Sequence, residues 1–192
     1  MRAYEVDTAS TTAIVSTATA KAHLKVDVSD DDDFIADLVS AATKAAEDYT
    51  NRFFMNTTIT MYGDTWDDIA TLYKSPVSSV THIKYYDADD ALQSLSTDIY
   101  LTDLVSKPAR ISLLPDQSFP DLSSRKMAVH IKYVVGEGTA VSDISDLIQQ
   151  SVLLMVGHWY EHRSSVISGK TAMEIPLTSQ MLLDQYKIQV CR

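Results

Sequence analysis

Two segments with helical periodicity flank a long stretch that lacks it, and this break limits the folds open to the chain. In residues 29–53, apolar side chains recur every three or four positions, from Ile35 to Phe53. The same spacing returns in residues 142–162. Such spacing places apolar side chains on one side of a helix. The sequence therefore predicts two long helices that are separated along the chain.

The stretch between them has the character of β-structure. It is rich in β-branched and aromatic residues that partly alternate with polar ones, and Pro, Asp and Gly interrupt it at intervals. The expected strands are residues 57–62, 80–86, 99–101, 110–114 and 128–135. We predict an α+β fold, with a helical core formed by two long helices flanking a small antiparallel β insertion, plus a short C-terminal helix.

A chain of 192 residues is long enough to form one domain with a core of its own. We expect a single domain over residues 1–192. Its helical core comes from about 17–53 and 142–187, its β-rich insertion from about 56–135, and its flexible termini from 1–15 and 188–192. A shorter helix is expected near Thr17–Leu24 and the C-terminal helix near Ser179–Lys187.

Composition excludes several classes of protein. The 26 acidic residues outnumber the 16 basic ones, giving a net charge of −10, which argues against duplex DNA binding through a basic patch. The longest purely apolar run, residues 152–156, is far shorter than the ~20 residues that span a bilayer. The single cysteine, Cys191, cannot form an internal disulfide, and no signal peptide is recognisable. We expect synthesis in the cytoplasm and no membrane partner.

One motif could carry chemistry. His158, Glu161 and His162 fit the pattern H-x-x-E-H, in which two histidines on one helical face hold zinc and the glutamate acts as general base. A third protein ligand would have to come from Glu174 or Asp184. The alternative is an ordinary helix end, where the histidines meet the negative pole of the helix dipole and Trp159 anchors the core.

Four consecutive aspartates, Asp30, Asp31, Asp32 and Asp33, mark a helix start, because carboxylates suit the positive pole of a helix. A calcium loop of the EF-hand type would need Gly and Glu where Ile35 and Ala41 stand. No nucleophile elbow and no glycine-rich phosphate loop occurs. We predict no catalytic residue and no cofactor.

The order of several segments resembles the head–tail connector family of tailed bacteriophages, also called head-completion or adaptor proteins. The resemblance covers roughly residues 20–187. It depends on the segment Ala22–Asp27 before the acidic helix start, the alanine-rich helix ending at residues 49–52, and later blocks at residues 75–80, 83–87, 131–136, 148–150, 157–163 and 174–176.

This resemblance implies a non-enzymatic structural protein of the virion neck. Such a protein forms a ring of about twelve copies below the portal protein, lets duplex DNA pass without specific binding, and offers a platform to the next neck or tail-completion protein. Two alternatives stay open: a zinc-dependent hydrolase built on the H-x-x-E-H segment, and a tail-completion or neck binding module.

For such a ring, we expect certain residues to contact another subunit or the portal and others to face DNA. The candidate contact residues are Trp159, Tyr160, Tyr186, Ile188 and Val190. The acidic helix start, Asp30–Asp33, is expected to face the DNA. Repeated around a ring, its negative charge would repel phosphates over roughly the Debye length of 8–10 Å.

Overall fold

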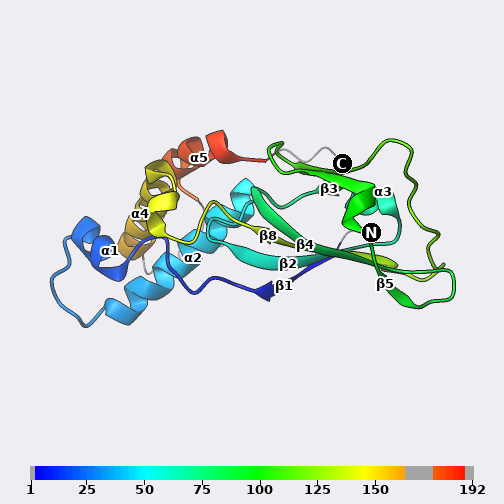
Figure 1. Ribbon diagram of the computed structural model, residues 1–192. Coiled ribbons are helices and arrows are strands. Elements are labelled where there is room, and N and C mark those ends of the chain that lie inside the picture. The colour runs from blue at the N-terminus through cyan, green and yellow to red at the C-terminus, as the bar shows by residue number, and fades with distance from the viewer. Residues whose placement is uncertain (1–2, 163–174, 189–192) are drawn as a thin grey trace, which may run out of the picture. The chain divides into compact units, whose positions relative to one another are not determined.

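The computed structural model describes residues 3–162 and 175–188, and their contacts divide the chain into two compact units. The helical unit comprises residues 11–54 and 138–187. The β-rich unit comprises residues 1–10, 55–137 and 188–192. Figure 1 shows helices and antiparallel sheets in separate parts of the chain, so the fold is α+β as predicted.

The helical unit contains four α-helices within the described residues: α1 (Thr17–Leu24), α2 (Asp32–Thr50), α4 (Asp146–Glu161) and α5 (Leu177–Leu183). Short 3₁₀ turns lie at Val141–Asp143 and Asp184–Tyr186. The hydroxyls of Ser16 and Ser145 cap α1 and α4 by accepting backbone N–H groups. α1 and α2 end at residues in the left-handed conformation, Lys25 and Asn51.

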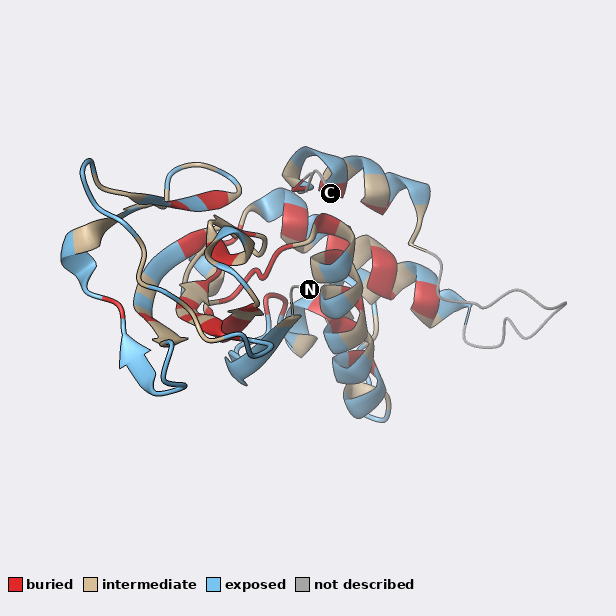
Figure 2. Cartoon of the chain, turned by 90° about the vertical axis from the view of Figure 1, so that its right-hand side faces the viewer, coloured by how far each residue is buried: buried red, intermediate tan, exposed pale blue. Residues whose placement is uncertain are grey.

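The core of the helical unit lies where α2, α4 and α5 meet. The apolar stripe of α2 is buried at Ile35, Val39, Ala42 and Ala46. On α4 the buried apolar residues are Ile148, Val152, Met155, Val156 and Trp159. Figure 2 shows buried and exposed positions alternating around these helices. α4 contacts both α2 and α5 and is thus the central helix of the unit.

The β-rich unit contains two antiparallel sheets. The larger has the order β1-β2-β8-β4-β5 and the smaller the order β3-β7-β6. A short helix, α3 (Trp66–Ile69), and a 3₁₀ turn at Thr97–Ile99 complete the unit. The strands are β1 (Ala3–Thr8), β2 (Thr57–Gly63), β3 (Thr71–Leu72), β4 (Val77–Tyr86), β5 (Leu92–Ser94), β6 (Tyr100–Asp103), β7 (Ala109–Leu113) and β8 (Val129–Val135).

β8 is the centre of the larger sheet, paired with β2 on one side and β4 on the other. Its side chains alternate, so that Val129, Ile131, Tyr133 and Val135 are buried while the residues between them are half-buried. Burial raises the pKa of the Tyr133 hydroxyl far above its ordinary value. This alternation gives the sheet one apolar face and one polar face.

Two expectations from the sequence need correction. Residues 3–15 are ordered rather than part of a flexible terminus, because Ala3–Thr8 pairs with β2 and the side chains of Ile14 and Val15 are buried. The second long helix begins at Asp146 rather than at Ser142 or Asp143, because Ile144 is extended and Ser145 supplies the cap. The described strands form two sheets, and the contacts divide the chain into two compact units, one built from the expected helical segments and the other from the expected β-rich insertion together with β1.

The structure also answers the expectation about membranes. Over the described ranges 3–162 and 175–188, no helix is both long and apolar enough to cross a bilayer.

Two glycines give a matched test of backbone packing. Gly136 has φ of 140°, and a Cβ there would lie 2.6 Å from the backbone nitrogen of Asn56. At Gly157 in α4, a Cβ would meet the His23 side chain at 3.5 Å, an ordinary contact. We predict that Gly136→Ala lowers the free energy of unfolding by about 1–3 kcal/mol, and that Gly157→Ala raises it by up to ~1 kcal/mol. Urea unfolding measures the free energy of unfolding of both variants. Equal changes in the two variants would contradict the close backbone packing at Gly136.

Candidate assembly surfaces

The acidic start of α2 is only partly open to solvent. The Asp31 carboxylate accepts a hydrogen bond from the Tyr160 hydroxyl at 2.7 Å, and Asp32 forms an ion pair with the Lys21 ammonium at 2.5 Å. These contacts tie α2 to α4 and to α1. Asp30 and Asp33 are exposed. The four aspartates mark the beginning of α2 as predicted, but Asp31 and Asp32 also hold the unit together, and only the other two are fully on the surface.

The predicted contact residues of α4 have different surroundings. Trp159 is 5% exposed, so its side chain belongs to the core of the helical unit and is not part of its exposed surface. The reason is its position on the buried stripe of α4, one helical turn after Met155. Tyr160 is half-buried, with its ring 6.2 Å from that of Phe34 between centroids. Its outward part stays a candidate for contact with a partner.

The predicted contact residues near the C-terminus are also partly enclosed. The Tyr186 hydroxyl lies 2.6 Å from the Ser145 hydroxyl oxygen, and the Arg52 guanidinium lies over its ring, 5.7 Å from the centroid. Tyr186 thereby braces the start of α4. Ile188 is buried, which removes it as an exposed contact residue. Val190 lies outside the described residues.

The H-x-x-E-H segment forms the end of α4. His158, Glu161 and His162 are all exposed, and the two imidazole rings lie 4.5 Å apart between centroids. Nδ1 of His162 lies 2.8 Å from the carbonyl oxygen of His158. Of the two further ligands considered, Asp184 accepts a hydrogen bond from the Tyr49 hydroxyl, and Glu174 lies outside the described residues. In the described part of the chain, no three His, Cys, Asp or Glu residues are grouped to hold a metal.

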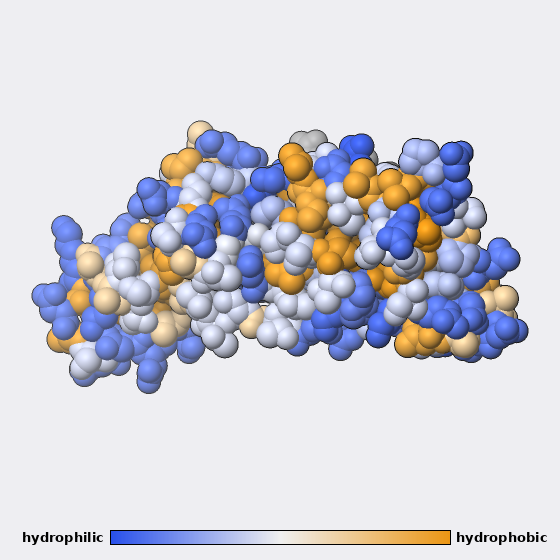
Figure 3. All heavy atoms as spheres, in the orientation of Figure 1, coloured by the Kyte–Doolittle hydropathy of each residue, from blue (hydrophilic) through white to orange (hydrophobic). Residues whose placement is uncertain are grey.

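The structure exposes apolar side chains that no pattern in the sequence marks as surface residues. In the β-rich unit they include Tyr4 and Val6 on β1, Leu101 on β6, and Val105 in the turn after β6. In the helical unit they include Leu177 and Met181 on α5. Figure 3 shows hydrophobic residues at the surface of the β-rich part of the chain. Exposed apolar groups of this kind are typical of protein contact surfaces.

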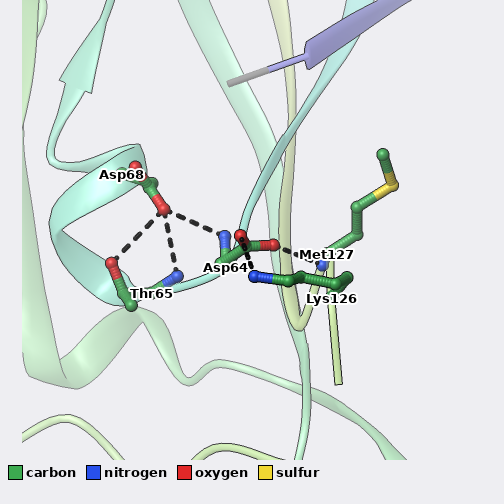
Figure 4. Close-up of polar contacts among 5 residues, drawn as sticks. All are labelled: Asp64, Thr65, Asp68, Lys126 and Met127. Atoms are coloured by element: carbon green, nitrogen blue, oxygen red, sulfur yellow. Dashed lines mark hydrogen bonds and ion pairs between the residues drawn. The ribbon is translucent and has the colours of Figure 1, made fainter. Parts of the chain in front are cut away.

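A set of polar contacts fixes the segment that leads into β8. The Asp64 carboxylate accepts the backbone N–H of Met127 at 2.8 Å and pairs with the Lys126 ammonium at 3.2 Å (Figure 4). The Asp68 carboxylate accepts hydrogen bonds from the backbone N–H groups of Asp64 and Thr65. The turn before α3 therefore holds residues 126 and 127 in place, although sixty residues separate them along the chain.

Aromatic stacking anchors an earlier part of the stretch that leads into β8. The Trp66 ring stacks on that of Phe119 at 4.5 Å between centroids, and its indole N–H donates to the carbonyl oxygen of Pro120 at 2.9 Å. Tyr85 packs against the same indole. The irregular stretch between β7 and β8 is thus tied to α3 and β4, which gives the β-rich unit a defined surface.

The Asp64 contacts predict a pH dependence. The Met127 backbone N–H and the Lys126 ammonium hold the pKa of the Asp64 carboxyl below its ordinary value. A carboxyl with a lowered folded pKa stabilises the protein above its unfolded pKa of about 3.9, and this stabilisation is lost as the pH falls through the folded pKa. We predict that wild type exceeds Asp64→Asn in stability at pH 6 and that the difference shrinks below about pH 4.

Chemical unfolding at a series of pH values measures this difference. Asp67→Asn serves as the control, because Asp67 is an exposed neighbour on α3 that takes no part in the contacts with residues 126 and 127. A difference between wild type and Asp64→Asn that is constant from pH 6 to pH 3 would contradict the role given to the Asp64 charge.

Comparisons with known proteins address the family and the fold. The family described as phage gp6-like head-tail connector protein matches residues 16–105, which confirms the resemblance over that part of the chain. No curated protein matches the chain. Among solved structures, a chain in the neck of an empty gene transfer agent (GTA) particle, computed with C6 symmetry, has a TM-score of 0.78 and 20% sequence identity. The match covers 99% of this chain and 97% of that one.

Two further structures have the same fold. A chain in the virion of a native gene transfer agent particle has a TM-score of 0.78 and 19% identity over 98% of this chain and 97% of its own. A chain in the neck of a native particle, computed with C12 symmetry, has a TM-score of 0.66 and 20% identity over the same shares of the two chains. The fold described above is therefore also that of proteins in these particles.

Proposed function

From the match of residues 16–105 to the phage gp6-like head-tail connector family, we propose that this chain is a structural protein of a head–tail neck. It acts by shape and association, and makes or breaks no covalent bond. The observation that carries the proposal is the agreement of this family match with a fold match over 99% of the chain. Its place of action is the neck of a virion, after synthesis in the host cytoplasm.

The proposed assembly is a closed ring of about twelve copies below the portal protein. Support comes from the solved necks, which were computed with C6 and C12 symmetry. A cyclic ring needs two different surfaces on each subunit that fit one another head to tail. The chain offers several exposed apolar side chains for such contacts, on β1, on β6 and on α5. The other face of the ring would receive the next neck or tail-completion protein.

Co-assembly with the portal protein of the same particle tests this proposal. We predict that the two proteins, mixed after separate purification, form one complex with several copies of this chain per portal ring. Mass photometry gives the stoichiometry, and negative-stain images give the position of the added density. A portal that stays bare at micromolar concentrations of this chain would contradict the proposal.

Duplex DNA would pass through this ring without specific binding. The net charge of −10 per copy supports passage without adhesion, because like charges repel phosphates within a Debye length. We propose that Asp30 and Asp33, the two exposed carboxylates at the start of α2, face the passage. Asp31 and Asp32 contribute charge from their contacts with Tyr160 and Lys21.

Charge reversal at Asp30 and Asp33 tests whether the start of α2 faces the DNA passage. We predict that rings with Asp30→Lys and Asp33→Lys gain affinity for a duplex DNA fragment at 150 mM salt and lose it again as salt rises, since each phosphate contact adds about −0.9 to the slope of log K against log salt. Wild-type rings should show no binding under the same conditions. Fluorescence anisotropy with labelled duplex measures this.

The matched control carries Asp89→Lys and Asp121→Lys, the same charge change at exposed positions of the β-rich unit. If the control gains as much DNA affinity as the α2 variant, the start of α2 does not face the passage.

A further inference from the structure

The polar face of the larger sheet gathers basic side chains at its centre. β8 lies between β2 and β4 (Figure 1), and the register of β4 on β8 places His82 opposite Lys132 and Lys84 opposite His130. Residues directly opposite each other in an antiparallel pair point to the same face. The residues between them are buried, so these four side chains lie together on the polar face. We call them the basic cluster.

The basic cluster carries a cost for the isolated copy. Like charges directly opposite each other destabilise a sheet. Burial and the neighbouring Lys84 and Lys132 ammonium groups hold the pKa of His82 below its ordinary value. Burial, Lys84, His82 and Arg125 lower the pKa of His130 in the same way. Both shifts show that the cations already present disfavour a further positive charge on this face.

Acidic side chains of the same copy compensate only one side of the basic cluster. Asp7 on β1 pairs with the Lys132 ammonium at 3.6 Å. On the other side, β5 places the uncharged Ser94 opposite Lys84. Among the residues that the structure describes, the Lys84 ammonium has no ion pair or hydrogen bond, and Nε2 of His130 is buried without a hydrogen-bond partner. The positive charge of Lys84 is therefore open to an anion from outside the copy.

Another cation stands beside the uncompensated side of the basic cluster. The Arg125 guanidinium lies over the Tyr86 ring, 3.7 Å from its centroid, and that ring lies 6.0 Å from the His130 ring. Arg125 pairs with Asp90 at 3.5 Å, but both side chains are exposed, at 41% and 59%, and exposed ion pairs contribute little. A guanidinium has five N–H donors, so Arg125 can bind a second carboxylate.

The borders of the basic cluster select the kind of anion that it can bind. Glu5 and Asp7 lie on β1 at one side, and the turn before β5 carries Asp89 and Asp90 at the other. Duplex DNA carries a phosphate charge about every 1.7 Å of helix axis, so it would bring phosphates against these carboxylates. A single carboxylate on a protein surface can enter between the borders without this repulsion. The face is therefore suited to a protein carboxylate and not to DNA.

Neighbouring copies of this chain carry such carboxylates. Each copy has a net charge of −10, so adjacent copies in a ring repel one another unless a cation of one meets an anion of the next. Exposed carboxylates are frequent on the described surface, for example at Asp67, Asp98 and Asp116. A second copy is thus the partner that both needs and supplies this contact.

We propose that Lys84 and Arg125 of one copy bind an exposed carboxylate of the next copy in the ring. The inference deepens the proposed function and rests on it, because a cyclic ring requires two different, complementary surfaces on each subunit. The incoming carboxylate offsets the like-charge repulsion within the basic cluster. Lys132 keeps its pairing with Asp7 and marks the limit of the contact.

Removal of the Lys84 charge tests this contact during assembly. Lys84→Gln should raise the concentration of this chain for half-assembly on the portal by about tenfold, since loss of one partner of a charge pair across an interface weakens association. Lys107→Gln is the matched control, because Lys107 is an exposed lysine of the β-rich unit outside the basic cluster, and it should assemble like wild type. Equal losses in the two variants, or no loss in Lys84→Gln, would overturn the inference.

Urea unfolding of the unassembled copies separates a lost contact from a folding defect. Because Lys84 lies opposite His130, removal of its charge should leave the urea midpoint unchanged or raise it. Weaker assembly without a lower midpoint supports a contact between copies. A lower midpoint for Lys84→Gln would assign Lys84 a role inside the copy and count against the inference.

Carbodiimide coupling identifies the partner carboxylate. The reagent joins an ammonium group to a carboxylate in contact with it through an amide bond, and mass spectrometry maps the adduct. In complexes assembled from equal amounts of isotopically labelled and unlabelled copies, Lys84 should give adducts that join the two forms. Lys132 and Asp7, 3.6 Å apart within one copy, are the internal control and should give adducts within a single form.

Two results of the coupling overturn the inference. One is the absence of a Lys84 adduct between copies while the adduct of Lys132 with Asp7 is present. The other is an adduct that joins Lys84 to the portal protein, since the partner is then not a second copy.

Failure of the proposed function and failure of this contact give different results. If wild-type protein forms no complex with the portal, the proposed function fails and the contact between copies falls with it. If rings form on the portal but Lys84→Gln assembles like wild type and Lys84 gives no adduct between copies, only the contact at the basic cluster fails.

Discussion

The packing of α2 against α4 is the constraint on which the helical unit depends. These helices lie almost a hundred residues apart along the chain, yet their apolar stripes form one core. Each fully buried Ile, Val or Met side chain contributes roughly 1.5–3 kcal/mol, which makes this core the main stabilising term of the unit. Polar contacts then fix the ends of the helices, with Asp31 bound to Tyr160 and Tyr186 bound to Ser145.

The β-rich unit is built and stabilised in a different way. Its larger sheet is built around β8, whose alternating burial leaves a polar face and two open edges. The irregular stretch before β8 is held by side chains, through Asp64 and Trp66, rather than by regular backbone pairing. In a monomer an open strand edge promotes aggregation. In a protein that assembles, the same edge can form a specific contact, because strand addition supplies contacts of defined direction.

Much of the fold could be predicted from the sequence, because the helices and central strands carry strong periodic signals. Residues 17–24 form α1 as expected, and the strands expected near 57–62 and 128–135 lie in β2 and β8. β1 was missed, although Tyr4 and Val6 alternate with Glu5 and Asp7, which is the pattern of a strand with one apolar face. β3 and β5, with two and three residues, are too short to give a periodic signal.

The candidate surfaces were harder to predict than the fold. Trp159 is an interface residue by type but a core residue by position, and only the packing of α4 distinguishes the two. The partners of Asp31 and Asp64 lie 129 and 63 positions away, respectively, and no local pattern reports such contacts. Val105 lies in a turn that the Asp103 carboxylate closes, and its side chain is exposed there. The sequence alone does not show whether a valine at this position is exposed or buried.

The central claim is that copies of this chain close into a ring at the neck of a particle. An electron cryomicroscopy reconstruction of the complex with its portal, calculated without imposed symmetry, tests this claim most directly. The account predicts a closed ring of this chain coaxial with the portal and an open passage along the axis. Isolated copies bound around the portal without contacts to one another, or density that blocks the passage, would contradict it.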